Sequence, residues 1–561
     1  MAIADLIFFL LFTGVLFFCA WFVGGYLGNV FGGGKIGLLS FLAPVEKALY
    51  RFFGVKPDAE TDWKSYAKSF VVFTLFGVGL LFAIQLCQGF LPFNPQGFGA
   101  VRWDSALNTA VSFATNTNWQ PLAGEASMSH FTQMVGMTVQ NFLSAAAGIA
   151  VCAALMRAFK RKSTEFIGNF WVDLTRAVLY VLLPLSILFS IIFAGLGVVQ
   201  TLAGAVPVGN LQGGSQVLPL GPVASQLAIK LIGSNGGGFF GANSAHPFEN
   251  PRLATNIISL LLILLIPASL PFAFGKILGD KKKGVAIFLV MLIMFAVGLG
   301  IVYTSETSTS QKLHMASNAS MYGKEVRFGT GTSALWSQAT TATSNGSVNS
   351  MHDMMNPFSN LVQIFNMVIG EVIFGGVGVG LIGMILYMVL TMFIAGLMIG
   401  RTPELIGKKL QVTEMWMAVI ALMGPAVVTL LMAGVFLLAK ANIGSPNPDG
   451  SRAITEILYA NASLVGNNGS ACGGFAANTM FVNLSGSFGM LLGRLATIIP
   501  AIALAGSLAK KKISPKSVAT IDIASPAFMF MLIFIIVIVG ALTFFPALLL
   551  GPVLEGMRLG M

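Results

Sequence analysis

The sequence predicts an all-α polytopic membrane protein with four repeats of span, short re-entrant helix, polar loop and span. An extra helix is expected at each end of the chain. Three observations predict this fold. The 561 residues are 55% hydrophobic and only 9% charged, whereas soluble domains carry about 25% charged residues. Ten apolar segments are long enough to cross a bilayer, and polar, asparagine-containing runs recur between them roughly every 115 residues, as expected of internal duplication.

The apolar segments are about 20 residues long or longer, the length that a membrane helix requires. They lie at 4–27, 69–90, 130–156, 177–199, 254–278, 284–304, 359–399, 414–439, 479–507 and 525–550. A straight helix over 359–399 would measure about 60 Å, twice the hydrocarbon thickness. We therefore expect this segment to bend or break at its glycine-rich stretch, 375–380.

The net charge of +11 indicates orientation rather than nucleic-acid binding. Most Lys and Arg residues lie in alternate connections, at 35–68, 157–176, 276–283, 401–409 and 510–516. The positive-inside rule places these connections in the cytoplasm and both termini outside. A basic patch for anionic membrane lipid or an acidic partner surface is the alternative at 510–512.

The repeats are predicted from the order of spans and polar runs. We expect an N-terminal helix with a cytoplasmic loop, four repeats and a C-terminal helix, at 1–68, 69–170, 171–282, 283–409, 410–516 and 517–561. The connections 203–216 and 443–449 contain Gly and Pro and are expected to be flexible extracellular segments.

Each repeat contains a short, moderately apolar segment before its polar run. These segments lie at 103–114, 222–232, 333–342 and 453–465. At about 1.5 Å per residue they are too short to cross the membrane. They are expected to enter from outside as half-helices and to leave the polar runs near mid-membrane.

The polar runs 114–119, 233–238, 343–347 and 466–470 are called the first to fourth polar loops. Such loops are tolerated at membrane depth only where they are buried in protein or line a water-filled path. Gly and Asn let successive carbonyls turn towards one axis, and Ser and Thr add hydroxyl oxygens. The loops contain no Asp or Glu, and a cation would meet the partly negative ends of the half-helices. This chemistry suits a weakly hydrated monovalent ion better than Ca²⁺ or Mg²⁺.

The predicted ion-binding residues are Thr115, Asn116, Thr117, Asn118, Ser234, Asn235, Gly236, Gly237, Thr343, Ser344, Asn345, Gly346, Asn467, Asn468 and Gly469. Aligned on Asn118, Asn235, Asn345 and Asn468, three loops have Gly next, whereas the first has Trp119. We expect Trp119 to pack behind its loop. An isolated Asn-Gly pair is usually only a turn, and the recurrence of the pattern is what favours a pore.

Two charged residues lie inside apolar segments. Arg494 is expected to sit just inside the pore and to repel cations from a direct route to the cytoplasm, although a packing arginine with a carboxylate partner is the alternative. Glu371 precedes Gly375 and Gly376. We expect these three residues to form a gating loop under the polar loops, with a hairpin turn or salt bridge as the alternative. His246 is expected to be a packing residue.

Several segments resemble the KdpA family, the potassium-binding subunits of bacterial Kdp potassium-transporting ATPases. They are LNTAVSFATNTNWQ (107–120), QNFLSAA (140–146), SNGGGFF (234–240), HPFENP (246–251), GEVIFGGVG (370–378) and MIGRTPE (398–404). The third and fourth polar loops match less closely, because family members can carry Cys at the position of Asn345, and Gly466 replaces an expected Asn.

The resemblance implies the potassium-transporter superfamily fold, with K⁺ as the bound and transported ion, in the bacterial inner membrane. It also implies that a KdpB-like P-type ATPase hydrolyses ATP and receives the ion sideways, with KdpC-like and KdpF-like subunits completing the complex. This sequence has no P-loop and no Asp-Lys-Thr-Gly motif, so we expect no catalysis by the chain itself. The alternatives are an autonomous Trk/Ktr-like potassium transporter and a non-transporting anchor for a partner ATPase.

Overall fold

The computed structural model describes residues 3–312, 321–400, 402–440, 450–515 and 521–559. Within these ranges ten helical segments are long and apolar enough to cross a membrane, and the predicted polytopic all-α fold is confirmed. Their main helices are α1 (Ile3–Gly32), α3 (Trp63–Cys87), α6 (Val139–Lys160), α8 (Leu183–Gly195), α10 (Leu253–Leu278), α11 (Lys281–Lys312), α14 (Val379–Met398), α15 (Val412–Leu438), α17 (Met480–Lys510) and α18 (Pro526–Leu548).

Local signals in the sequence set the ends of several spans. Asp62, Thr479 and Ser525 each accept a hydrogen bond from the backbone N–H three residues later, and so cap α3, α17 and α18. Helix α10 ends at Gly279, whose φ of 74° is left-handed. Glycine takes this conformation without steric cost, which makes it the usual residue after a helix.

Four short helices lie between the spans and end at the polar loops. They are α4 (Trp103–Ala114), α9 (Val223–Ile232), α12 (Gly329–Ala342) and α16 (Gly450–Gly466). Each agrees with a predicted half-helix, although α12 and α16 begin a few residues earlier than expected. All four are buried over most of their length, so their Ser, Thr and Asn side chains lie within protein.

The long apolar segment 359–399 is broken, as its glycines predict. Helix α13 (Pro357–Val368) and helix α14 are separated by the connection 369–378. Within it, Gly370 and Gly378 have φ values of 82° and 90°, and Glu371 and Phe374 each have φ of 50°. Left-handed φ at two residues with side chains is uncommon, so the surrounding packing must hold this connection in place.

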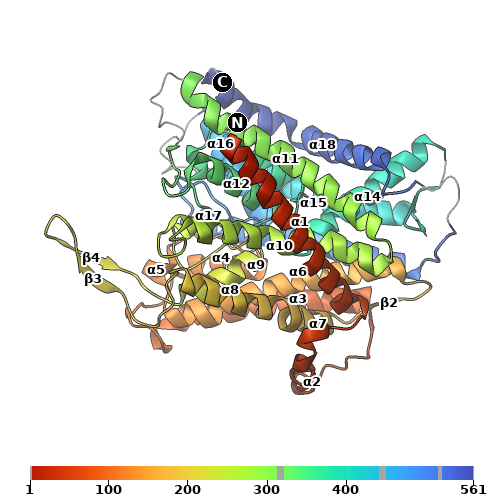
Figure 1. The fold of residues 1–561 in the computed structure, drawn as a ribbon, viewed down its shortest axis with the longest axis horizontal. Helices are drawn as coiled ribbons and strands as arrows, with labels where there is room; N and C mark the ends of the chain where they lie inside the picture. The colour runs from red at the N-terminus through yellow and green to blue at the C-terminus, as the bar shows by residue number, and fades with distance from the viewer. Residues whose placement is uncertain (1–2, 313–320, 401, 441–449, 516–520, 560–561) are drawn as a thin grey trace.

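The connection 203–216 differs from its prediction. It contains the antiparallel hairpin of β3 (Val206–Gly209) and β4 (Ser215–Leu218), which projects from the left end of the molecule in Figure 1. Asn210 closes the turn by accepting hydrogen bonds from the backbone N–H groups of Gln212 and Gly214, at 3.1 and 2.7 Å. Pro207 lies within β3 and Gly213 lies in the turn, so the connection contains regular structure that was not predicted. The predicted connection 443–449 lies outside the described residues.

The remaining elements are short and lie in the connections and at the ends of spans. They are η1 (Gly37–Leu42), α2 (Ala43–Phe52), β1 (Thr61–Asp62), η2 (Gln88–Phe90), α5 (Gly124–Ser127), η3 (Thr132–Thr138), β2 (Phe166–Gly168), α7 (Phe170–Arg176), η4 (Ala177–Leu182), η5 (Asn243–Ala245), η7 (His352–Met354), β5 (Glu404–Leu405), β6 (Lys408–Lys409), η8 (Leu549–Val553) and α19 (Leu554–Arg558). Strand β1 pairs with β2, and β5 with β6.

The N-terminal helix α1 packs across α10 (Figure 1). Glycines allow the close approach. A Cβ atom on Gly24 would overlap the backbone oxygen of Ser269 and the Cβ of Phe272, and one on Gly28 would lie 2.9 Å from Lys276. Small residues at such crossings let helices gain van der Waals contact in a membrane, where no hydrophobic force drives them together.

Replacing Gly24 with Leu should therefore separate α1 from α10. We expect a loss of about 1–3 kcal/mol, the usual cost of overpacking, seen as a lower thermal-unfolding midpoint of the purified protein in detergent. Gly14→Leu is the matched control, because Gly14 lies on the same helix with open space around its Cα. Equal midpoints for the two variants would contradict the role of this contact.

Candidate functional site

The first three polar loops are joined by hydrogen bonds between loops. Asn116 Nδ2 donates to the carbonyl oxygen of Ser234 at 3.3 Å, and Asn235 Nδ2 donates back to Asn116 Oδ1 at 2.6 Å. The carbonyl oxygen of Asn235 accepts from the backbone N–H of Gly346 at 3.1 Å. The second loop is thus held by both of its neighbours.

The fourth polar loop closes these contacts into a ring. Ser344 Oγ of the third loop donates to the carbonyl oxygen of Asn467 at 2.8 Å. Asn467 Nδ2 then donates to Thr117 Oγ1 of the first loop, also at 2.8 Å. Four segments that are far apart in the sequence therefore converge at one place in the fold.

Glycines allow the loops to touch one another through their backbones. Gly236 and Gly469 have left-handed φ values of 94° and 91°. A Cβ on Gly236 would overlap the backbone of Gly346, and a Cβ on Gly469 would overlap the carbonyl oxygen of Thr117. These two positions need glycine for both their conformation and their space.

The hydrogen bonds correct the predicted alignment of the loops by one residue. One N–H in each loop donates to a carbonyl five residues earlier, in the last turn of its half-helix; the four donors are Thr117, Asn235, Asn345 and Asn468. Asn118 is therefore equivalent to Gly236, Gly346 and Gly469, and it adopts a left-handed φ of 58°. The sequence alignment was wrong because the asparagines were matched by residue type, whereas Asn also tolerates the conformation that favours Gly.

Trp119 thus follows the loop positions that are equivalent to one another. It is 1% exposed and packs edge-on against Phe475, which follows the fourth polar loop, with ring centroids 6.3 Å apart. Its ring fills space between the first and fourth repeats.

The structure brings all fifteen predicted loop residues into one buried cluster. The side chains of Thr115 and Thr343 donate to carbonyls of their own half-helices, at Val111 and Ala339, so they stabilise the helix ends. The remaining loop atoms near the centre are amide and hydroxyl groups and backbone carbonyls. Among the described residues no group of three His, Cys, Asp or Glu side chains could hold a metal ion. The cluster therefore offers neutral oxygen ligands, which suit a monovalent cation.

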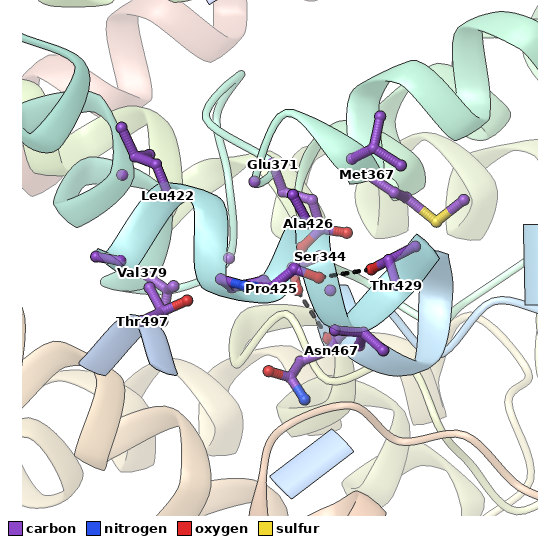
Figure 2. Close-up of a pocket in the computed structure, with 18 of the residues that line it drawn as sticks. Ser344, Met367, Glu371, Val379, Leu422, Pro425, Ala426, Thr429, Asn467 and Thr497 are labelled. Atoms are coloured by element: carbon purple, nitrogen blue, oxygen red, sulfur yellow. Dashed lines mark hydrogen bonds between the residues drawn. The ribbon is translucent and has the colours of Figure 1, made fainter. Parts of the chain in front are cut away.

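Glu371 lies directly beneath this cluster. Its Oε1 accepts a hydrogen bond from Asn468 Nδ2 at 2.7 Å. Figure 2 shows Glu371, Ser344 and Asn467 around one cavity of about 60 Å³. Gly376 also faces the third loop, since a Cβ on it would lie 2.8 Å from the Cβ of Ser344.

Gly375 allows the connection 369–378 to fold back on itself. A Cβ at this position would overlap the carbonyl oxygen of Glu371, and the backbones of Gly375 and Gly380 are in direct contact. The connection is therefore compact and lies immediately under the polar loops. A larger residue at either glycine would force it open.

Arg494 lines the same cavity from α17 and is 5% exposed. In the part of the chain that the structure describes, no carboxylate lies within ion-pairing distance of its guanidinium group, and its Nε has no hydrogen-bond partner. A carboxylate-paired packing arginine is therefore not what the described residues form. The Arg494 guanidinium group lines the same cavity as the Glu371 carboxylate.

A chain of hydrogen bonds behind the fourth loop could not be predicted from the sequence. His352 Nδ1 pairs with the Tyr459 hydroxyl at 2.6 Å, and that hydroxyl pairs with Ser470 Oγ at 2.7 Å. The backbone N–H of Ser470 donates to Asn468 Oδ1 at 3.0 Å. Burial lowers the pKa of His352 to about 3, so its ring is neutral at physiological pH. Because Asn468 Oδ1 accepts from Ser470, the Nδ2 group of Asn468 points to Glu371. The pairing of Asn468 with Glu371 is set by the tertiary structure and does not show in the sequence.

A family model described as "Potassium-transporting ATPase A subunit" matches residues 10–557, nearly the whole chain. The chain belongs to the KdpA family. Curated relatives named "Potassium-transporting ATPase potassium-binding subunit" include proteins of Edwardsiella ictaluri, 51% identical with 92% of each chain covered, and of Brucella anthropi, 48% identical with 97% covered. A third, from Pseudomonas aeruginosa, is 48% identical with 96% covered.

A solved structure of more distant sequence shows the same fold. The potassium transporter TrkH from Vibrio parahaemolyticus superposes with a TM-score of 0.50 at 17% identity, over 79% of this chain and 85% of its own. The two chains therefore share a fold over most of their length.

Replacing Gly469 with Ala should distort the ring of loops. We expect a loss of about 2–4 kcal/mol, because the left-handed conformation and the overlap with Thr117 both disfavour a Cβ. The measurement is the thermal-unfolding midpoint in detergent. Gly466→Ala is the control, since the nearest atom to its added Cβ would be 3.7 Å away. A midpoint for Gly469→Ala as high as that of the control would refute the tight contact.

Proposed function

We propose that this chain is the potassium-selecting subunit of an ATP-driven uptake pump in the bacterial inner membrane. The observation that carries the proposal is the closed ring of polar loops, which gathers neutral oxygens from four repeats. Because K⁺ holds its hydration water weakly, carbonyl and hydroxyl oxygens in fixed positions can replace that water. The names of the relatives, all potassium-binding subunits, support the same ion.

The four proposed repeats comprise residues 69–170, 171–282, 283–409 and 410–516. Both termini lie on the outer side of the membrane. K⁺ enters from outside and binds at the fifteen loop residues. The connection 369–378 and the charge of Arg494 then oppose direct passage to the cytoplasm. The ion leaves sideways towards a KdpB-like P-type ATPase, and KdpC-like and KdpF-like subunits complete the assembly.

An autonomous potassium transporter is the second candidate, because the fold is shared with a Trk-type protein. Reconstitution separates the two. The chain alone and the chain with its ATPase partner are placed in liposomes, and K⁺ uptake and ATP hydrolysis are measured. ATP-dependent uptake by the complex, with hydrolysis stimulated by K⁺, supports the pump. Steady K⁺ flux through the chain alone supports the autonomous transporter.

Gly236→Asp should raise the K⁺ concentration that half-maximally stimulates ATP hydrolysis and should weaken discrimination against Na⁺. The added side chain has no room beside Gly346 and must distort the second and third loops. The matched control is Gly209→Asp, which adds the same charge on the exposed hairpin where nothing lies within 4 Å. If ATP hydrolysis by Gly236→Asp showed the same K⁺ dependence as the control, the loops would not be the site that selects the ion.

Arg494→Met should remove the charge that opposes direct passage of cations. We expect an ATP-independent K⁺ leak in liposomes that hold the complex, and fewer ions transported per ATP hydrolysed. Arg494→Lys keeps the charge, so liposomes that hold this variant should show no ATP-independent K⁺ leak. If Arg494→Met neither leaks nor alters this coupling ratio, the barrier to direct passage lies elsewhere.

A further inference from the structure

A buried ion pair lies behind the second polar loop and is used by none of the steps above. Lys230 and Glu249 are each 1% exposed at their side chains, and Lys230 Nζ pairs with Glu249 Oε1. Lys230 belongs to the last turn of α9, four residues before Ser234. Glu249 belongs to the segment HPFENP (246–251), a motif that has no part in the proposed path of the ion.

The lysine holds the second loop through its backbone. Its carbonyl oxygen accepts from the N–H groups of both Asn235 and Gly236, each at 2.9 Å. It also receives Asn345 Nδ2 of the third loop at 3.4 Å. Any shift of Lys230 therefore moves two of the four loops.

The side chain of Lys230 reaches the same loop by a second path. Its Nζ donates to Asn243 Oδ1 at 2.8 Å, and Asn243 Nδ2 donates to the carbonyl oxygen of Gly236 at 2.7 Å. Because Oδ1 is occupied by the ammonium group, the carboxamide can present only its N–H side to Gly236. The orientation of a loop carbonyl thus depends on the lysine.

The carboxylate is held between the second and third repeats. Glu249 Oε1 also accepts from Ser244 Oγ at 2.9 Å, and Ser244 Oγ pairs with Ser347 Oγ of the third loop at 2.9 Å. Glu249 Oε2 is buried without a hydrogen-bond partner and faces Gly238, where a Cβ would lie 3.3 Å away. The negative charge is therefore positioned against the second loop as well.

The rest of the motif fixes the position of Glu249. The His246 ring stacks on Phe240 with centroids 3.7 Å apart and planes 3° from parallel. Asn250 Nδ2 donates to the carbonyl oxygen of Ser244 at 3.1 Å. The predicted packing role of His246 agrees with this stacking.

We propose that Lys230, Asn243 and Glu249 are positioning residues for the ion site, and that Glu249 neutralises a lysine charge that would otherwise repel the bound cation. The proposal rests on the proposed function and deepens it. A positive charge at the end of a half-helix, buried in a medium of low dielectric constant, acts on an ion over several ångströms. Here the carboxylate cancels that charge while the lysine keeps its hydrogen bonds.

The test uses the reconstituted complex with its ATPase partner. Glu249→Gln keeps the shape of the side chain and an acceptor oxygen but removes the negative charge. We expect the K⁺ concentration for half-maximal stimulation to rise about tenfold or more, with the maximal rate within about twofold of wild type. An unchanged half-saturation would overturn the proposal.

The double variant Lys230→Gln/Glu249→Gln separates charge from structure. It removes both charges but keeps a side-chain amide N–H at position 230 that can still donate to Asn243 Oδ1, so we expect half-saturation to return towards the wild-type value. A double variant with the defect of Glu249→Gln would show that charge is not the cause and would overturn the proposal. If Glu249→Gln does not assemble, the double variant alone decides: wild-type-like half-saturation supports the proposal, and a raised value refutes it.

Asp173→Asn is the matched control. Asp173 is also a buried carboxylate in an ion pair, with Arg157 at 2.6 Å and the Tyr66 hydroxyl at 3.0 Å, and neither partner touches a polar loop. It should lose stability without a change in K⁺ half-saturation. Failure of this inference differs from failure of the proposed function: in the first case Gly236→Asp still alters the ion dependence, and in the second K⁺ does not stimulate even the wild-type complex.

Discussion

The structure depends on the closed ring of hydrogen bonds between the four polar loops. Each loop is tied to its own half-helix by a backbone hydrogen bond to a carbonyl five residues earlier, but this bond does not place it against the other three loops. Partners from the neighbouring repeats supply the missing constraints, from Asn116 with Ser234 to Asn467 with Thr117. A buried polar network of this kind is stable only when most of its donors and acceptors are paired. Distortion of one loop therefore destabilises the other three.

Charge is arranged around this ring rather than within it. The loops themselves are neutral, while Glu371 and Arg494 lie beneath them and the pair Lys230–Glu249 lies behind them. Fixed dipoles bind a weakly hydrated cation without holding it so firmly that it cannot leave. Full charges at a distance can then act on where the ion goes, without entering its coordination shell.

Much of this fold follows from the sequence. The ten spans, the four half-helices and the break in 359–399 were predicted, because apolar length and glycine content are local properties of the chain. The correct alignment of the first loop and the hairpin at 206–218 were not predicted. Asn118 adopts a conformation that its type only permits, and the hairpin depends on a turn closed by Asn210.

Only part of the site could be predicted from the sequence. A recurring pattern pointed to the loop residues, but nothing in the sequence pairs His352 with Tyr459 or Lys230 with Glu249, which are 107 and 19 residues apart. Such pairings are set by tertiary packing. Lys230, the single charged residue of α9, was the available signal for the second pair, since a buried charge requires a partner.

The last contact of the ring has a consequence for the synthesis of the protein. Asn467 and Thr117 are 350 residues apart, so the first loop stays incomplete until almost the entire polypeptide has left the ribosome. Until then Thr117 Oγ1 lacks the Asn467 amide that finally donates to it. A polypeptide released before the fourth repeat would lack the partner of Thr117 and could not close the ring of loops.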